Sequence, residues 1–341
     1  MTSKALDNLK ILLQTPNLAS KKWIYEQYDS QVMNDTIQTG GDAAIVRVHG
    51  TIKALALTTD CTPRYVEADA FEGAKQAVAE TYRNISAVGG KPLAITNCLN
   101  FGNPQKPEIM GQIVRAIQGI TAACKALDYP VVSGNVSLYN ETDGAAIQPT
   151  PAIGGVGLLK DMHKRCDSKF KFEGDEVFII GETKGHLSCS IYEAEILKID
   201  AKKNPPIVDL LEEKKNSEFV RSLIAASEIN ACHDISDGGI AVALFEMCNE
   251  NLGCEINLDE IKEVSKLTNE NQILFAEDQS RYIVALDSNS VKDFRKKCEK
   301  QGIKICKIAT VKKDKIFLNE NSFEIKELAK LNEMVFEKKF S

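Results

Sequence analysis

One segment of the chain, residues 131–142, combines residue types that hold a metal ion beside a phosphate group. It begins as an apolar strand, and Gly134 then gives a ligand close access to a backbone N–H. Asn135 offers an amide oxygen, a hard donor that suits Mg²⁺. Ser137 places a hydroxyl on the same face as Asn135 if the segment is extended, and Glu141 adds a carboxylate nearby. Because Gly-Asn is also typical of a β-hairpin tip, a purely structural turn is the alternative interpretation.

A second segment, residues 94–104, has the same character. An apolar run leads into Asn97, Asn100 and Asn103. Asparagine is a poor former of both helices and strands, so we expect a loop after Thr96. Turn formation alone would explain such a loop. Ligand sites in α/β proteins gather at strand ends, however, and two such ends in one domain favour a binding rim.

These two segments resemble the signature segments of the phosphoribosylformylglycinamidine synthase family. The resemblance rests on Thr96-Asn97-Cys98-Leu99-Asn100-Phe101-Gly102-Asn103-Pro104 and on Ser133-Gly134-Asn135-Val136-Ser137-Leu138-Tyr139-Asn140-Glu141-Thr142. It is most specific for the C-terminal half of the large, synthetase subunit, and it extends from about Leu12 to about Val311. The family belongs to the aminoimidazole ribonucleotide synthetase-like superfamily, which also includes thiamine-monophosphate kinase.

The resemblance implies roles for individual residues. It places ATP contacts at Asn97 and Gly134, a magnesium ligand at Asn135 and a substrate contact at Ser137. The family commonly has Asp at the position of Asn97. Asn keeps the acceptor oxygen but lacks the charge, which favours hydrogen bonding to the nucleotide over metal bridging. The family's catalytic histidine and its ATP-clamping lysine belong to the other half of its chain, so we expect no catalytic residue on this chain.

The resemblance also implies a reaction, with ATP and Mg²⁺ as cofactors. The family phosphorylates the amide oxygen of formylglycinamide ribonucleotide, and ammonia from a glutamine amidotransferase subunit displaces the phosphate. The product, formylglycinamidine ribonucleotide, belongs to de novo purine biosynthesis. We therefore expect an ATP-dependent carbon–nitrogen ligase component that is inactive without the N-terminal half of the synthetase, with a homodimer as another way to associate. The alternative is a non-catalytic scaffold half that binds a nucleotide and stabilises the synthetase complex.

Three aspartates are further candidates, each with a structural alternative. Asp60 ends a predicted strand, as a metal-side or phosphate-side carboxylate or as an ordinary strand terminator. Asp234 and Asp237 lie in a segment that matches the family's Asp-Ile-Ser-Asp-Gly-Gly motif. The alternative is that Ser236 or Asp237 caps a helix over residues 240–249.

Composition excludes several classes of function. The net charge is −6 and the charged residues are interspersed, so no basic field attracts nucleic acid. We find no apolar run long enough to cross a membrane and no signal-peptide pattern, which predicts a cytoplasmic protein with no membrane partner. The 10 cysteines and 4 histidines show no metal-binding spacing, so we expect reduced thiols and no zinc site.

The predicted elements alternate between strands and helices. We expect strands over 43–48, 53–59 and 92–96, with helices over 69–87 and 107–127. Residues 1–40 form a predicted helical segment, which the resemblance implies is the connector ahead of the family's second half; the structural alternative is a helical cap on the domain that follows. Residues 41–160 and 161–341 then form two domains. The resulting fold class is α+β, with an aminoimidazole ribonucleotide synthetase-like N-terminal α/β domain (half of a β-barrel dimer core) followed by a C-terminal α/β sandwich domain.

Overall fold

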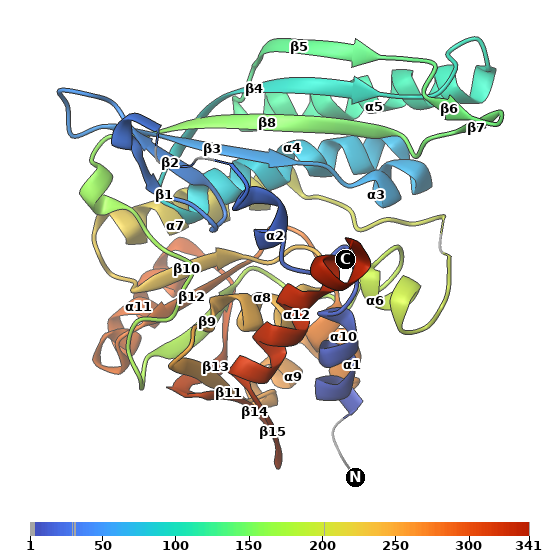
Figure 1. Ribbon diagram of the computed structural model, residues 1–341. Helices are drawn as coiled ribbons and strands as arrows, with labels where there is room; N and C mark the ends of the chain where they lie inside the picture. Colours follow the sequence, from blue (N-terminus) through green and yellow to red (C-terminus); the bar gives the residue numbers. More distant parts are fainter. Residues whose placement is uncertain (1–3, 29, 31, 201, 341) are drawn as a thin grey trace.

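The computed structural model describes residues 4–28, 30, 32–200 and 202–340. Two β-sheets lie on opposite sides of a layer of helices, so that the chain forms an upper and a lower half in Figure 1. The six-stranded sheet contains residues between 36 and 159, and the seven-stranded sheet contains residues between 176 and 324. We retain residues 160–161 as the proposed boundary between an N-terminal and a C-terminal domain.

The N-terminal sheet has the strand order β1-β2-β3-β8-β4-β5. Its strands are β1 (Thr36–Gln38), β2 (Ala44–Arg47), β3 (Ala54–Asp60), β4 (Lys91–Asn100), β5 (Val131–Ser137) and β8 (Thr150–Leu159). All neighbours are antiparallel except β4 and β5, which run parallel. Beyond β5, a short hairpin of β6 (Glu141–Thr142) and β7 (Ala145–Ala146) extends past the end of the sheet (Figure 1).

Helices cover one face of this sheet. They are α3 (Pro63–Ala68), α4 (Ala70–Ala87) and α5 (Pro107–Leu127). The Asp69 carboxylate caps α4 by accepting from the backbone N–H groups of Phe71 and Glu72, as the sequence predicts. The two long helices approach closely at Gly119, where a Cβ atom would lie 2.1 Å from the carbonyl oxygen of Phe71. The absence of a side chain at Gly119 therefore sets the distance between α4 and α5.

The other face of the N-terminal sheet has no cover within the described part of the chain. Leu57 on β3 and Leu93 on β4 are 38% and 42% exposed. Strand β5 forms one edge, and its Val132 and Val136 side chains are 71% and 56% exposed. An apolar sheet face and an apolar edge strand of this kind are typical of an interface with another domain.

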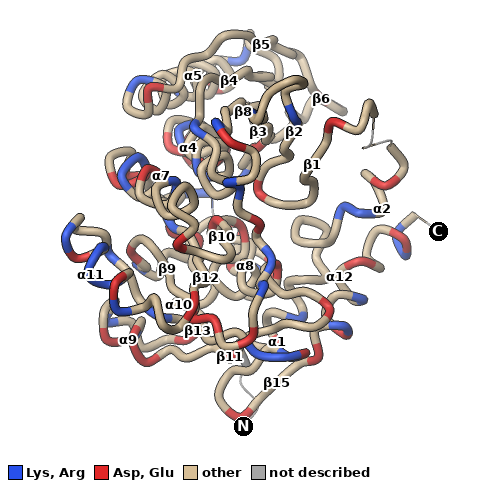
Figure 2. The backbone as a smooth tube through the Cα atoms, turned by 90° about the vertical axis from the view of Figure 1, so that its left-hand side faces the viewer, with Lys and Arg blue, Asp and Glu red and all other residues tan. Residues whose placement is uncertain are grey.

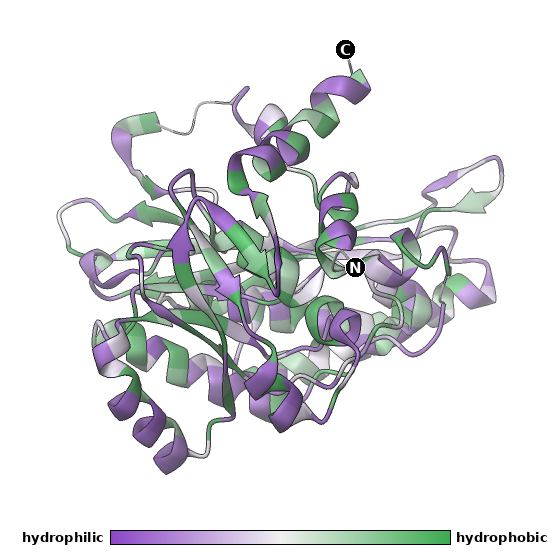
Figure 3. Cartoon of the chain, turned by 90° about the horizontal axis from the view of Figure 1, so that it is seen from below, coloured by the Kyte–Doolittle hydropathy of each residue, from purple (hydrophilic) through white to green (hydrophobic). Residues whose placement is uncertain are grey.

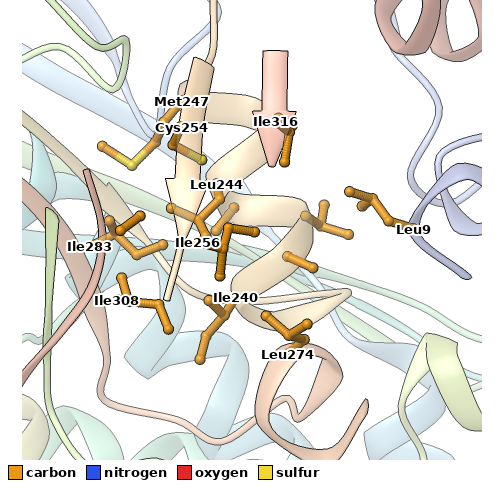
Figure 4. Close-up of a cluster of buried hydrophobic side chains, with 14 of the residues drawn as sticks. Leu9, Ile240, Leu244, Met247, Cys254, Ile256, Leu274, Ile283, Ile308 and Ile316 are labelled. Atoms are coloured by element: carbon orange, nitrogen blue, oxygen red, sulfur yellow. The ribbon is translucent and has the colours of Figure 1, made fainter. Parts of the chain in front are cut away.

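The C-terminal sheet has the order β10-β12-β9-β13-β11-β14-β15. Its strands are β9 (Glu176–Ile180), β10 (Ala231–Asp234), β11 (Leu252–Ile256), β12 (Tyr282–Leu286), β13 (Ile305–Lys313), β14 (Lys315–Leu318) and β15 (Asn321–Glu324). Only β11 and β14 pair in parallel. Its largest apolar cluster includes Ile240, Leu244, Ile283 and Ile308 (Figure 4).

The remaining helices surround this second sheet. They are α6 (Ile191–Glu195), α7 (Leu210–Ala225), α8 (Gly239–Met247), α9 (Asp259–Ser265), α10 (Glu270–Phe275), α11 (Val291–Gln301) and α12 (Ile325–Phe340), with short 3-10 turns at Val32–Asn34, Met162–Lys164 and Ser288–Ser290. Helix α7 packs against α4 and α5, which joins the two domains. Seen from below, the central elements are mainly hydrophobic and the peripheral helices carry hydrophilic faces (Figure 3).

The N-terminal segment is helical, but the alternative that it caps the following domain is wrong. Helices α1 (Lys4–Leu12) and α2 (Lys22–Tyr25) precede β1. Leu6, Leu9 and Leu12 belong to the apolar core of the C-terminal domain. The Asn332 side chain on α12 donates to the carbonyls of Leu13 and Leu18 at 2.8 and 2.9 Å. The first and last helices of the chain are therefore held together in one domain.

Two loop predictions are also wrong. Strand β4 continues through Asn97 to Asn100, and β5 continues through Asn135 to Ser137, so neither segment breaks after its apolar run. The asparagines stay extended because β4 lies between β8 and β5 and its backbone is paired on both sides. Asn135 is therefore not a hairpin-tip residue.

The charge distribution agrees with the sequence prediction. Lysine, arginine, aspartate and glutamate alternate along the backbone of both domains (Figure 2). None of the described helices is both long and apolar enough to cross a membrane.

Candidate functional site

The first candidate site lies where β4 and β5 run side by side. Asn97 is paired with Gly134, and Asn100 is paired with Ser137. A Cβ atom at Gly134 would lie 2.2 Å from the Asn97 Oδ1 atom, so the Asn97 side chain occupies the space above Gly134. The structure thus brings together the two residues expected to contact ATP, and only glycine fits opposite this asparagine.

The four predicted ligand residues are divided between the two faces of the sheet. Side chains alternate along a strand, so Asn135 and Ser137 share one face. Asn97 shares the opposite face with Leu99, which is 9% exposed and packs toward the helices. A ligand that contacts all four residues must approach the free edge of β5, because only this edge reaches both faces.

Ser137 and Glu141 are both fixed by neighbouring groups. The Asn140 side chain contacts the Ser137 hydroxyl and donates to the Phe101 carbonyl at 3.0 Å, which orients Ser137 against the end of β4. The Glu141 carboxylate accepts from the Asn103 N–H at 3.0 Å and from the Lys106 ammonium at 2.9 Å. The hydrogen bond from Lys106 holds the pKa of Glu141 below its usual value. Glu141 therefore has partners within the chain and ties β6 to the loop after β4.

A second group of candidate residues lies where the two domains meet. Asp60 at the end of β3 accepts from the Asn84 side chain at 3.0 Å and from the Thr58 hydroxyl at 3.1 Å. Asp234 at the end of β10 is 3% exposed. Glu80 on α4 accepts from the Gln76 side chain at 2.6 Å, and its carboxylate interacts electrostatically with Asp234.

These carboxyl groups have perturbed acidities. Burial, with the nearby Asp234 charge, raises the pKa of Glu80 to about 7. Burial, with the nearby Asp42 charge, raises the pKa of Asp234 to about 7. Asp60 also has a raised pKa because of burial and the Glu80 charge. Three carboxylates that resist ionisation together suit a divalent cation, which would neutralise them and accept their hard oxygen ligands.

Among the described residues, Asp42, His233 and Asp234 place their ligand atoms close enough together to hold one metal ion. Asp60 and Glu80 form a carboxylate cluster with Asp234 beside them. Asn84 belongs to the same group, and its Oδ1 atom is buried without a hydrogen-bond partner in the described structure. The Oδ2 atom of Asp234 also has no hydrogen bond there, although the Arg83 Nε atom lies 3.4 Å from it. Both atoms are oxygen acceptors, the ligand type that Mg²⁺ prefers. Sequence reasoning identified Asp60 and Asp234 but missed Glu80 and Asn84. Their four-residue spacing on a buried helix was the available signal.

Two basic residues border the carboxylate cluster. Arg83 is fully buried, and its guanidinium lies 3.4 Å from Glu213 and 3.4 Å from Asp234 while donating to Gln279 at 3.0 Å. His233 lies between Asp42 and Glu246. Burial lowers the pKa of His233, but Asp42 and Glu246 outweigh burial and raise it above its usual value. These ion pairs link α4 and the segment before β2 to the C-terminal domain.

Asp237 has a different role from the helix cap that was the alternative prediction. Helix α8 begins after Gly238, which has a φ of +80° and provides no side-chain cap. Asp237 instead accepts from the Arg64 guanidinium at 2.6 Å, and Arg64 also lies 3.7 Å from the buried Glu277. Glu277 contacts the Tyr65 hydroxyl as well. The segment from Glu277 to Arg281 is buried.

We predict that the carboxylate cluster makes stability depend on pH and on divalent cations. The folded-state pKa values of Glu80 and Asp234 are about 7, above the ordinary values of 4.5 and 3.8. The folded state therefore binds more protons than the unfolded state between these values, and stability falls as pH rises from about 5 to about 8. We expect a loss of roughly 1–3 kcal/mol without divalent cations. Denaturant unfolding across this range measures it.

Magnesium should offset this loss above pH 7. Addition of MgCl₂ at pH 8 should raise the melting temperature more than it does at pH 6, and NaCl of matched ionic strength should not. Glu80→Gln should abolish the difference. An equal response to both salts at pH 8 would contradict a metal site at this cluster.

Comparison with known protein families assigns this chain to a class of proteins. Residues 40–159 match the model for the N-terminal domain of AIR synthase related proteins, and residues 173–318 match the model for the C-terminal domain. The chain therefore belongs to the AIR synthase related proteins and carries one domain of each kind.

Within this class, the chain is homologous to phosphoribosylformylglycinamidine synthase subunit PurL. It is 49% identical over 314 residues to PurL of Azorhizobium caulinodans. The aligned region covers 92% of this chain and 42% of that protein. It is 55% identical over 286 residues to PurL of Novosphingobium aromaticivorans. That alignment covers 82% of this chain and 38% of that protein. The chain thus spans about two fifths of the length of these relatives.

Solved structures share the fold. The structure of Thermotoga maritima PurL complexed with FGAR matches with a TM-score of 0.75 at 18% identity, over 96% of this chain and 53% of that chain. The complex of the same protein with ADP matches with a TM-score of 0.72 over 95% of this chain and 51% of that chain, also at 18% identity. Thiamine-monophosphate kinase from Stenotrophomonas maltophilia matches with a TM-score of 0.57 at 15% identity, over 84% of this chain and 92% of that chain. At these identities the comparison supports the α+β fold alone.

Proposed function

We propose that this chain supplies the C-terminal half of the synthetase that converts formylglycinamide ribonucleotide to formylglycinamidine ribonucleotide with ATP. The observation that carries this proposal is the paired arrangement of Asn97 and Gly134 at the free edge of the N-terminal sheet. Similarity to PurL over 92% of the chain supports the same activity. This similarity favours the ligase over the non-catalytic scaffold.

The residues of the β4–β5 edge have distinct roles in this proposal. The exposed backbone at Gly134 approaches the phosphates of ATP, and Asn97 hydrogen-bonds to the nucleotide. Asn135 supplies a neutral oxygen ligand to magnesium, and Ser137 contacts the ribonucleotide substrate. Magnesium, when bound, stabilises the negative charge that develops during phosphoryl transfer. The carboxylate cluster is proposed as a second place for a divalent ion.

The open face of the N-terminal sheet is the proposed contact with the N-terminal half of the synthetase. Its exposed Leu57 and Leu93 side chains would be buried by a second sheet, which would complete the barrel. A second copy of this chain is the competing partner. A glutamine amidotransferase supplies ammonia to the assembled enzyme, and the relatives are themselves named as subunits, which is consistent with such an assembly.

The isolated chain should show no turnover of formylglycinamide ribonucleotide with ATP, Mg²⁺ and ammonia. Addition of the N-terminal half of a PurL relative should restore product formation and should form a complex that co-elutes with this chain. ADP release coupled to product formation is the measurement. Turnover by the isolated chain, or tight nucleotide binding with no turnover in the reconstituted complex, would contradict the proposal.

Asn135→Leu tests the magnesium ligand directly. The substitution keeps the approximate size of the side chain but removes its oxygen. We expect Mg²⁺-dependent nucleotide affinity to fall by about 1–3 kcal/mol, the usual effect of leaving a polar partner unsatisfied. Asn135→Asp should retain part of the affinity because a carboxylate is also a hard oxygen donor.

Calorimetric titration of the assembled protein with ADP, with and without Mg²⁺, separates this role from a structural one. Ile117→Leu, at a half-exposed position of α5 away from this edge, is the control and should leave the affinity unchanged. If Asn135→Leu leaves Mg²⁺-dependent affinity unchanged in folded protein, Asn135 is not a metal ligand.

A further inference from the structure

A cavity of about 820 Å³ lies between the two domains, away from the edge of β5. Its wall combines the start of α4, the loop after β9, the connection from α6 to α7, the first turns of α7 and the loop before β12. The α6–α7 connection passes beside α3, where Lys202 pairs with Glu67 at 3.0 Å (Figure 1). The volume falls in the range of small-molecule sites, and the cavity shares none of its lining residues with the β4–β5 edge.

Most of the acidic groups on the wall are already satisfied by the protein. The Asp278 carboxylate accepts from three successive backbone N–H groups, those of Lys184, Gly185 and His186, at 2.7, 2.9 and 3.2 Å. Asp69 and Asp209 accept from the first N–H groups of α4 and α7. These carboxylates therefore have little remaining capacity to bind a cationic ligand.

Two cations on the wall have no such partner. Lys184 and Lys203 make no side-chain ion pair or hydrogen bond with the described residues, whereas the neighbouring Lys304 pairs with Glu182 at 3.0 Å. Lys184 and Lys203 come from different loops on the rim of one cavity. Two unpaired ammonium groups at one cavity suit a phosphate or another compact dianion.

Helix α7 presents hydrogen-bond acceptors to the same cavity. Asn216 is 2% exposed, and its Nδ2 donates to the Ser280 carbonyl at 2.9 Å. Its Oδ1 atom is buried and has no hydrogen-bond partner in the described structure, which is costly unless a ligand or water donates to it. Glu212 lies one turn earlier on the same face of the helix and also lines the cavity. The two residues together suit the hydroxyl, amide or amino donors of a ligand.

We propose that this cavity is a second ligand site, which binds a small phosphate ester whose other end carries hydrogen-bond donors, such as a phosphorylated ribose derivative. Lys184 and Lys203 hold the phosphate, and Asn216 and Glu212 accept from the donor end. The two sets of groups lie on different elements, so a ligand must contain both ends to satisfy them together. The proposal does not depend on the activity of the β4–β5 edge.

Titration of the intact chain with ribose 5-phosphate tests this proposal. We expect saturable binding that is at least 10-fold tighter than that of ribose or of inorganic phosphate. Lys184→Gln and Lys203→Gln should each weaken it 5-fold or more. Lys300→Gln, on the exposed surface of α11, is the matched control and should leave it unchanged. Glu212→Gln should weaken binding without changing the melting temperature of the free protein.

The outcomes also separate this site from the proposed active site. Asn135→Leu should bind ribose 5-phosphate as tightly as the parent chain. Loss of binding in Asn135→Leu would assign the ligand to the edge of β5 and overturn the proposal. Equal binding of inorganic phosphate and ribose 5-phosphate, or no saturable binding at millimolar concentration, would also overturn it and leave the cavity a water-filled interface.

Discussion

Arg83→Met should lower the free energy of unfolding by about 3–5 kcal/mol at pH 8, the usual cost of removing one partner from a buried ion pair. Arg83 is fully buried on α4 and is placed between Glu213 and Asp234 of the C-terminal domain. Methionine keeps the length of the side chain but leaves Glu213 without its ion-pair partner, while Asp234 retains only the His233 imidazole at 3.7 Å. Since Arg83 also donates to Gln279, the substitution weakens the contact between the domains at three points.

The pH dependence of this loss identifies its cause. Without Arg83, the pKa values of Glu213 and Asp234 should rise further, so both groups can be protonated in the folded protein near pH 5.5 and the cost should shrink there. Arg115→Met on α5 is the control, because Arg115 is half exposed and pairs with Asp69 at 3.4 Å. It should change stability by less than about 1 kcal/mol. A cost for Arg83→Met that is equal at pH 5.5 and pH 8 would assign the effect to packing.

Gly119→Ala should destabilise the chain by about 3 kcal/mol or more. The added Cβ would meet the Phe71 carbonyl oxygen at 2.1 Å and the Lys75 N–H nitrogen at 3.1 Å. Both are backbone atoms of α4, so the contact is relieved only if the two helices separate, at a cost in the upper range for overpacked cores. Separation would also move Glu80 and Asn84, so the response to Mg²⁺ should weaken in the same variant.

Gly111 on the same helix provides a matched control. A Cβ atom at Gly111 has no atom within 4 Å, and alanine has the higher helix propensity. Gly111→Ala should therefore stabilise the chain by up to about 1 kcal/mol. Chemical denaturation of both variants measures the difference. If the two substitutions change the free energy of unfolding equally, the close contact between α4 and α5 is not what makes alanine unfavourable at Gly119.

Local signals in the sequence predicted the helices well. Asp69 caps α4, and α5 extends from Pro107 to Leu127, as the pattern of apolar residues and Pro107 indicated. Each of these signals depends on groups a few residues apart, which sequence alone supplies. The apolar stripe of Leu6, Leu9 and Leu12 also predicted a helix, but nothing in the stripe specified which domain would bury it.

Features set by distant partners were not predictable in this way. Asn97 lies within a strand because β5 and β8 pair on either side of it, although its own propensity opposes a strand. Asp237 pairs with Arg64, which is 173 residues away in sequence, and this ion pair replaces the expected helix cap. In both cases the environment of the residue depends on elements that approach it only in the folded chain.

The residues of the candidate site were likewise predictable from the sequence, but their arrangement in space was not. Sequence resemblance predicted Asn97, Gly134, Asn135 and Ser137, and the structure places them on two adjacent strands. Their division between two faces of the sheet follows from the register of β4 and β5, which no residue type indicates. Glu80 and Asn84 were missed because a polar pair on a helix is ordinarily solvated, and only the packing of α4 between the domains makes it a candidate ligand pair.

The contact between α1 and α12 has a consequence for synthesis of the protein. The carbonyl groups of Leu13 and Leu18 accept hydrogen bonds from Asn332, which lies more than 300 positions later in the sequence. These bonds can form only after Asn332 has been synthesised. The N-terminal domain has all its strands by Leu159 and can form while the rest is being translated. The C-terminal domain gains these two hydrogen bonds only after α12 has been translated, so we expect its folding to finish later than that of the N-terminal domain.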